Sequence, residues 1–218
     1  MKELEKEFFS KHDPKLLSVL RASVVGIAGA GGLGSNVAIS LARAGVGKLI
    51  IADFDRIAAS NLNRQQYFMH QIGKLKIKAL LENLKKANPF SAYEVHNVRI
   101  NKKNISKIFG QAEILVEAFD QAKMKQMLIE AWLSRFPGRP IIAASGLAGI
   151  GRNEKIHTRR LGNLYICGDE ETVCPRGVSP LAPRVGIVAN MQANLVLELL
   201  VRMRSLKRIP TRRESRSR

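Results

Sequence analysis

Short apolar runs alternate with longer stretches of helical periodicity along most of the chain. One helical stretch follows Gly73, where apolar residues from Ile77 to Leu84 recur on one face and Asn88-Pro89 ends the pattern. Other patterns predict strands at about 23–28, 48–53, 91–98, 112–119 and 140–145, and helices at about 34–44, 104–109, 121–135 and 184–203. Because strands and helices alternate, we predict a mostly parallel sheet with helices on both faces, a doubly wound α/β fold.

The pattern changes at both ends of this alternating region. Residues 1–21 are predicted to be an N-terminal helical segment, interrupted near Asp13-Pro14, that packs on the domain or reaches a neighbouring subunit. Residues 22–205 are predicted to form one domain. Residues 206–218 are a basic segment that we expect to be a disordered tail.

One internal segment, residues 146–183, has poor periodicity and many glycines, prolines and charges. We expect one or two strands there, near 156–160 and 164–166, followed by a long loop. Long loops inside compact domains tend to be functional or disordered.

A glycine-rich turn follows the first predicted strand. Gly29, Gly31 and Gly34 fit the G-x-G-x-x-G spacing, and Gly32 removes one more side chain. These glycines permit a tight turn, a close approach of a phosphate and close packing of a helix, whose N-terminus attracts anions. Asp53 ends the next predicted strand, at the position where a carboxylate meets a nucleotide ribose. The sequence therefore predicts a Rossmann-like nucleotide site without specifying the nucleotide.

The formal net charge of +18 predicts attraction to anionic partners. The segment from Arg202 to Arg218 holds eight basic residues and a single acidic one, Glu214. Scattered lysines and few aromatic residues make nucleic acid an unexpected partner. Because no signal-peptide pattern and no apolar run of ~20 residues is found, and there are only two cysteines, we expect a cytoplasmic protein without membrane association.

Basic residues near the predicted nucleotide site favour a triphosphate over a dinucleotide. Arg64 and Lys76 would neutralise its charge, and Asp120, with Asp55 as a further candidate, would hold Mg²⁺. Such a set suits nucleotidyl transfer. Taken singly, Lys76 would suit a solvated helix lysine, and Asp120 a helix N-cap.

These motifs stand in an order that identifies a family. Gly29-Ala-Gly-Gly-Leu-Gly34, Asp53-Phe-Asp55, Ser60-Asn-Leu-Asn-Arg-Gln65 and Ile72-Gly-Lys-Leu-Lys76 resemble the ThiF/MoeB/ubiquitin-activating superfamily. Asp120 and Ala182-Pro-Arg-Val-Gly186 extend the resemblance, which covers about residues 20–203. Ile166-Cys-Gly-Asp-Glu-Glu171 and Leu195-Val-Leu-Glu-Leu-Leu200 are similar to the short, clostridial-type ThiF group, which adenylates the sulfur carrier ThiS.

The resemblance implies that ATP and Mg²⁺ bind this chain and that the C-terminal Gly-Gly carboxylate of a ThiS-like carrier is adenylated for thiamine thiazole synthesis. It also implies a homodimer. By the resemblance, the glycine turn holds the ATP phosphates and Asp53 the ribose. Asn61, Arg64 and Lys76 contact phosphate with support from Gln65, and Asp120 holds Mg²⁺ beside Gln121.

The sequence departs from the family at three points. With only Cys167 and Cys174, it lacks the two C-x-x-C pairs that hold structural zinc in many relatives, so zinc is not expected. Cys174 lies near the place where some relatives use a carrier-linked cysteine, but an incidental thiol is the favoured interpretation. Relatives also use an N-terminal arginine from the partner subunit, for which Arg21, Lys11 and Lys15 are candidates.

The sequence allows several alternative functions. The carrier could belong to a molybdopterin or cysteine pathway, or the chain could be a tRNA-modifying relative. An NAD-dependent oxidoreductase and a non-catalytic nucleotide-binding scaffold are disfavoured, because neither needs Arg64, Lys76 and Asp120 together.

Overall fold

The computed structural model describes residues 2–172 and 179–207. The helices and strands of these residues follow one another in this order: α1 (Lys2–Phe8), α2 (Pro14–Arg21), β1 (Val24–Ala28), α3 (Gly32–Arg43), β2 (Lys48–Asp53), η1 (Ala59–Asn61), η2 (Met69–Gln71), α4 (Lys76–Ala87), β3 (Ala92–Asn97), α5 (Ile105–Phe109), β4 (Ile114–Glu117), α6 (Ala122–Arg135), β5 (Ile141–Ala144), η3 (Asn153–Lys155), β6 (His157–Leu161), β7 (Leu164–Gly168) and α7 (Ala182–Lys207).

These strands form one sheet in the order β3-β2-β1-β4-β5-β7-β6. Every pairing is parallel except that of β6 with β7, which form an antiparallel hairpin. The chain moves outward from β1 to β2 and β3, then returns to place β4 on the other side of β1. The carboxyl ends of β1 and β4 therefore flank the point where the strand order reverses, the usual ligand position in such sheets.

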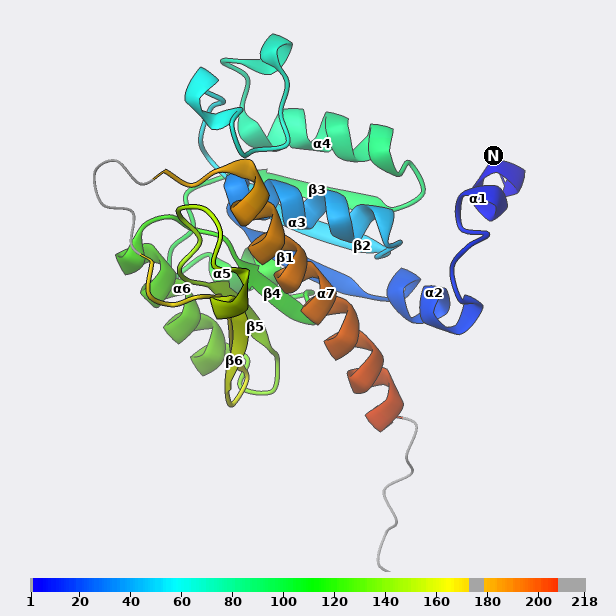
Figure 1. The fold of residues 1–218 in the computed structure, drawn as a ribbon. Coiled ribbons are helices and arrows are strands. Elements are labelled where there is room, and N and C mark those ends of the chain that lie inside the picture. The colour runs from blue at the N-terminus through cyan, green and yellow to red at the C-terminus, as the bar shows by residue number, and fades with distance from the viewer. Residues whose placement is uncertain (1, 173–178, 208–218) are drawn as a thin grey trace, which may run out of the picture.

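Helices cover both faces of the sheet, as predicted (Figure 1). On one face α3 lies between α4 and α7, and α2 packs against α7. On the other face α5 and α6 cover the strands with Phe109, Leu128 and Trp132. The sheet thus has two hydrophobic cores, a first one under α3, α4 and α7 and a second one under α5 and α6. Because neighbouring strand residues point to opposite faces, Val25 and Ile27 lie in the first core and Ala28 in the second. The predicted doubly wound α/β fold is confirmed.

Two predicted boundaries beside the glycine turn are wrong. α3 begins at Gly32, not Gly34, because the turn is completed at Gly29 (φ 100°) and the Ser35 amide already donates to the Gly31 carbonyl (3.0 Å). β4 ends at Glu117 instead of continuing to residue 119. There the Glu117 carboxylate accepts the Phe119 amide (2.7 Å) and turns the backbone out of the sheet.

Helix α7 crosses the first face beside α3 and is longer than predicted. By length and composition, its segment Ala182–Ser205 could cross a membrane, but half of its most apolar stretch is buried inside the structure. Val188, Val196 and Leu200 lie in the first core. These properties are those of a core helix.

The two terminal expectations have different outcomes. The break near Asp13-Pro14 is confirmed, since α1 ends at Phe8 and α2 begins at Pro14. The helix α7 runs two residues past the predicted domain end at residue 205, and residues 208–218 of the predicted tail lie outside the described residues.

Candidate active site

The glycine turn lies between the carboxyl ends of β1 and β4. Gly29 adopts a positive φ, and a Cβ there would approach the Ala118 carbonyl oxygen to 2.8 Å. A Cβ on Gly34 would overlap the Gly29 carbonyl, so this position holds the helix close to the strand. The result is a helix N-terminus whose free amides are reachable by an anion.

Asp53 is fixed beside this turn. It ends β2, and one carboxylate oxygen accepts the Ala30 amide (2.6 Å) while the other accepts the Asp55 amide (2.7 Å). The carboxylate therefore faces the glycine turn, as its spacing predicts.

Tyr67 is a site residue that the sequence analysis missed. Its hydroxyl donates to the Ala30 carbonyl (2.7 Å) in the glycine turn. Burial raises the pKa of Tyr67, and the nearby carboxylates of Asp53 and Asp55 raise it further, so the phenol stays protonated and remains a donor. No motif in the sequence predicts a role for this residue. The only sequence feature that could have suggested one is its position three residues after Arg64.

The loop from Ser60 to Gln66 covers the glycine turn. The aliphatic carbons of Arg64 lie 3.4 Å from where a Cβ on Gly32 would stand, so the Arg64 side chain packs directly over Gly32. Arg64 Nη1 donates to the Asn63 side chain (2.7 Å). Gln66 and the Arg64 carbonyl both bond Asn36 on α3 (2.6 and 3.0 Å). Asn36 thus ties the loop to the first turns of α3.

Two other predicted residues of this loop have different surroundings. Gln65 is buried, and its side-chain nitrogen Nε2 is 3.9 Å from the Cβ position of Gly31. Its side-chain oxygen Oε1 has no hydrogen-bond partner among the described residues. Asn61 instead accepts the Ala58 amide (3.0 Å) and shapes the loop.

Lys76 corrects the interpretation of a solvated helix lysine. It is the first residue of α4, and only 8% of its side chain is exposed. Its ammonium pairs with Asp55 at 2.8 Å, and the Asp55 carboxylate is itself about half exposed. Asp55 connects Lys76 to Asp53 through the Asp55 amide. A buried cation with an exposed, exchangeable partner can accept an incoming phosphate.

Asp120 and Gln121 lie at the carboxyl end of β4 and are both exposed. The preceding Phe119 ring lies 3.4 Å from the Cβ position of Gly29, which puts this segment beside the glycine turn. The N-cap of α6 is Gln121, not Asp120, so the capping alternative for Asp120 is wrong. In residues 2–172 and 179–207, no three His, Cys, Asp or Glu side chains gather to hold a metal.

The remaining candidates lie away from this edge. Arg21 ends α2 before β1, at the opposite edge of the sheet, where it pairs with Glu5. Lys11 and Lys15 are exposed in the same N-terminal segment. Cys167 is buried, and burial raises the pKa of its thiol. Cys174 lies outside the described residues.

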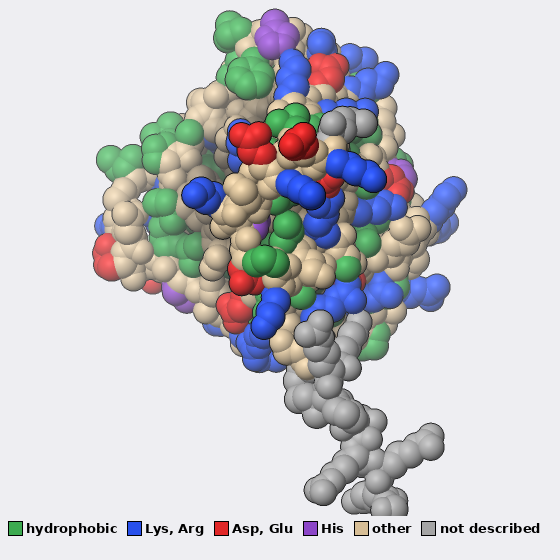
Figure 2. Space-filling model, turned by 90° about the vertical axis from the view of Figure 1, so that its right-hand side faces the viewer, with side chains coloured by type: hydrophobic (Ala, Val, Ile, Leu, Met, Phe, Trp, Pro, Cys, Tyr) green, Lys and Arg blue, Asp and Glu red, His purple; other side chains and the backbone are tan. Residues whose placement is uncertain are grey.

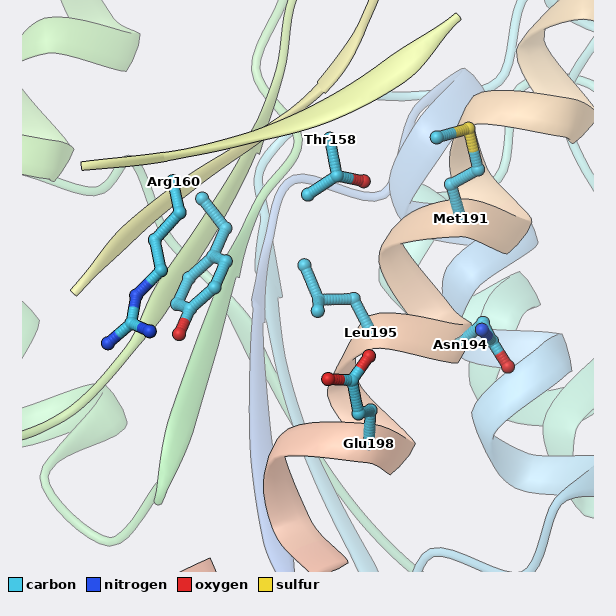
Figure 3. A pocket seen from close by; sticks show the side chains of 7 residues that line it. Thr158, Arg160, Met191, Asn194, Leu195 and Glu198 are labelled. Atoms are coloured by element: carbon cyan, nitrogen blue, oxygen red, sulfur yellow. The ribbon is translucent and has the colours of Figure 1, made fainter. Parts of the chain in front are cut away.

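Two cavities are also distant from the glycine turn. One of about 330 Å³ lies between the β6–β7 hairpin and α7, where Arg160 lies beside the Tyr165 ring and Leu195 and Glu198 project from the helix (Figure 3). The other, about 520 Å³, is lined by Arg139 and Met203 among others, near the amino ends of the strands. Neither contains a residue predicted for the nucleotide.

Basic side chains are numerous on one side of the molecule. Figure 2 shows Lys and Arg over the side seen from the right of Figure 1, with acidic side chains between them.

The chain is similar in sequence to two curated relatives. "Adenylyltransferase and sulfurtransferase MOCS3" of Caenorhabditis briggsae is 32% identical over 192 residues, covering 84% of this chain and 47% of the relative. "Adenylyltransferase and sulfurtransferase uba4" of Aspergillus niger is 35% identical over 195 residues, covering 82% and 40%. The chain therefore spans less than half the length of these curated relatives.

The fold is shared with E. coli tRNA N6-threonylcarbamoyladenosine dehydratase, TcdA, solved in complex with ATP. The TM-score is 0.83 at 18% identity, with 92% of this chain and 95% of that chain covered. E. coli MccB is similar at a TM-score of 0.66 and 22% identity, covering 86% and 58%. At these identities the likeness concerns the fold. The sequence match to the ThiF family extends over residues 5–215, and we conclude that the chain belongs to the ThiF family.

Proposed function

We propose that this chain is an adenylyltransferase that uses ATP to activate the C-terminal carboxylate of a ubiquitin-like sulfur carrier. Family membership supports the proposal, and so do the names of the two relatives, each an adenylyltransferase and sulfurtransferase. We propose only the adenylyltransferase activity for this chain, and not the sulfurtransferase activity in the names of these relatives.

One observation carries the proposal: Arg64 packs across Gly32 at the N-terminus of α3, and Asp53 is held at the same turn by the Ala30 amide. The turn would receive the ATP phosphates, and Asp53 the ribose. Arg64 would neutralise phosphate charge, and Lys76 would exchange Asp55 for a phosphate oxygen. Cations placed where charge develops are the main means of accelerating such transfers.

The reaction needs no nucleophile from the enzyme. A carboxylate oxygen of the carrier's last glycine attacks the α-phosphorus, and the bond to the bridging oxygen breaks with the electron pair leaving on pyrophosphate. The product is an acyl-adenylate. Arg64 and Lys76 reduce the repulsion between two anions, and Gln65, whose side-chain nitrogen lies beside Gly31, would support the loop that carries Arg64.

Asp120 is the proposed ligand for Mg²⁺. Its exposed carboxylate beside the glycine turn suits a hard cation that takes its other ligands from phosphate and water. When bound, Mg²⁺ would neutralise phosphate charge. Gln121 lies next to this ligand.

The finer proposal concerns the partner and the setting. We propose a ThiS-like carrier ending in Gly-Gly and thiamine thiazole synthesis, on the motifs shared with the short ThiF group. We also propose a homodimer, on the family resemblance and the N-terminal segment, and a cytoplasmic location, on the composition of the chain. A carrier of another pathway is the alternative, since the two relatives are not of that group. Sedimentation velocity of the purified chain tests the dimer, which a monomer mass of 24.2 kDa would contradict.

ATP–pyrophosphate exchange with the full chain, Mg²⁺ and a ThiS-like carrier tests the function. We expect exchange that requires the terminal glycine of the carrier. The exchange rate should fall at least ~100-fold in Arg64→Ala and Lys76→Ala, because each variant removes a positive charge that stabilises the transition state. Lys78→Ala is the matched control, since Lys78 is exposed two residues further along α4, and should stay within about twofold of wild type.

Other outcomes have definite meanings. No exchange with any Gly-Gly carrier, despite tight ATP binding, contradicts the proposal and favours a sensor or scaffold. Exchange with a different carrier retains the chemistry and replaces the pathway. A preference for NAD over ATP overturns the chemistry.

A further inference from the structure

A buried ion pair joins the end of β7 to the start of α7. Arg184, the third residue of α7, donates from Nη2 to Asp169 Oδ2 at 2.6 Å. The two side chains are only 5% and 1% exposed. Replacing such a pair by apolar residues is often neutral or stabilising, so its net contribution to stability does not explain it.

The pair is the centre of a junction of four segments. Asp169 Oδ1 accepts the amides of Glu171 and Thr172 (3.0 and 2.8 Å), and the Thr172 hydroxyl donates to Oδ2. The Asp169 amide donates to the Gly146 carbonyl (3.2 Å), just beyond β5. Arg184 Nη1 donates to the Gly151 carbonyl. Such directional bonds fix positions in a way that apolar packing does not.

The fixed helix start touches the candidate nucleotide site. Val185, the residue after Arg184, is fully buried, and its Cγ1 lies 3.3 Å from where a Cβ on Gly32 would stand. The Pro180 carbonyl accepts from Asn63, the neighbour of Arg64 (3.4 Å). Figure 1 shows the first turn of α7 at the same end of the sheet as the start of α3.

We propose that Asp169 and Arg184 form a positioning pair that fixes the first turn of α7 against Gly32, and thereby sets the conformation of the glycine turn required for ATP binding. The consequence for ATP rests on the proposed function. Neither residue touches the glycine turn itself; the effect passes through Val185.

Hydrogen–deuterium exchange and ATP affinity test this proposal on the full chain. We expect Asp169→Asn to speed amide exchange at residues 31–36 at least tenfold more than at residues 24–28 of β1, where exchange reports only the loss of global stability. We also expect it to raise the ATP dissociation constant at least tenfold. Arg184→Lys keeps the charge but cannot reach both acceptors as a planar fork, so it should give a smaller change in the same direction.

The matched control is Glu170→Gln. Glu170 neighbours Asp169 but pairs with the exposed Arg159 on the hairpin, and its variant should match wild type in both measurements. Should Asp169→Asn not fold, Val185→Ala leaves the pair intact and removes the contact with Gly32. It should raise the ATP dissociation constant by a similar factor.

The two proposals fail in different ways. If wild type binds ATP and Asp169→Asn matches it in exchange and affinity, the positioning role is overturned while the function stands. Equal acceleration at residues 24–28 and 31–36 also overturns it, because the pair would then act only on global stability. If wild type binds no ATP, the proposed function fails, and exchange at residues 31–36 still decides whether the pair positions the turn.

Discussion

Gly34 shows how one missing side chain determines the geometry of the site. A Cβ at this position would overlap the backbone carbonyl of Gly29, which no rotamer change can relieve. The helix and the strand can approach only because neither carries a side chain at the contact.

We therefore expect Gly34→Ala to lower the free energy of unfolding by about 3 kcal/mol or more, and to abolish ATP binding, because α3 must move away from β1. Urea denaturation and calorimetric titration with ATP measure the two effects. Gly186→Ala is the control, because nothing lies within 4 Å of its Cβ position inside α7. Alanine has the higher helix propensity, so the free energy of unfolding of this variant should rise by roughly 0.5–1 kcal/mol. A Gly34→Ala protein with wild-type affinity would contradict this account of the turn.

At the scale of elements, local sequence signals determine where helix α2 begins, and tertiary contacts determine where it packs. Asp13 caps α2 by accepting the Leu16 amide (2.8 Å), and Pro14 occupies the first helical position, so the start of this helix is encoded locally. Its place is not. Leu20 packs into the core beside α7, which makes part of the predicted N-terminal segment integral to the fold.

Leu20→Ala should lower the free energy of unfolding by about 3 kcal/mol, because Leu20 is 1% exposed and its removal leaves a cavity. Leu4→Ala in α1, where the leucine is 58% exposed, should change it by less than about 0.5 kcal/mol. Equal, small losses in the two variants would show that α2 is dispensable. Denaturation in urea at neutral pH compares the variants.

At the scale of the whole molecule, the stability of the fold against acid depends on buried carboxylates. Burial alone would raise the pKa of Asp169, but hydrogen bonds from Thr172, Glu171 and Arg184 outweigh it and lower the pKa from 3.8 to about 2. Because the folded pKa is depressed, this carboxylate stabilises the folded chain above pH 4 and loses that effect as the pH falls toward 2.

The shift corresponds to roughly 2 kcal/mol, and removing one partner of a buried pair costs about 3–5 kcal/mol. We expect Asp169→Asn to be less stable than wild type by at least about 2 kcal/mol at pH 7, with a difference that narrows below pH 4. Glu198→Gln, at an exposed pair on α7, should change stability by no more than about 0.5 kcal/mol at either pH. A deficit for Asp169→Asn that stays constant down to pH 2 would contradict the depressed pKa.

Residues whose roles follow from local chain geometry were predicted from the sequence. Gly29 and Gly34 lie in one turn, where spacing alone brings them together, whereas Asp53 ends β2 and joins the turn because β2 pairs with β1. Lys76 was predicted as a site residue from its motif, but its burial was not predicted, because its position on α4 taken singly suits a solvated lysine. In the structure it pairs with Asp55 and is only 8% exposed. Tyr67, Asn36 and the Asp169–Arg184 pair depend on loops folding back over α3 and α7, which no period records.

The sequence by itself determined the alternating strands and helices and the glycine turn, because hydrophobic period and backbone freedom act within a few residues of each position. The family was inferred separately, from the resemblance of its ordered motifs to those of known proteins. Only the tertiary structure decided which strands are neighbours and which loops cover the turn. It also decided that the start of α7, 153 positions after Gly32 at Val185, forms a wall of the candidate site. Such contacts join segments that are distant along the chain, and their positions are set by the packing of the whole core rather than by any local pattern.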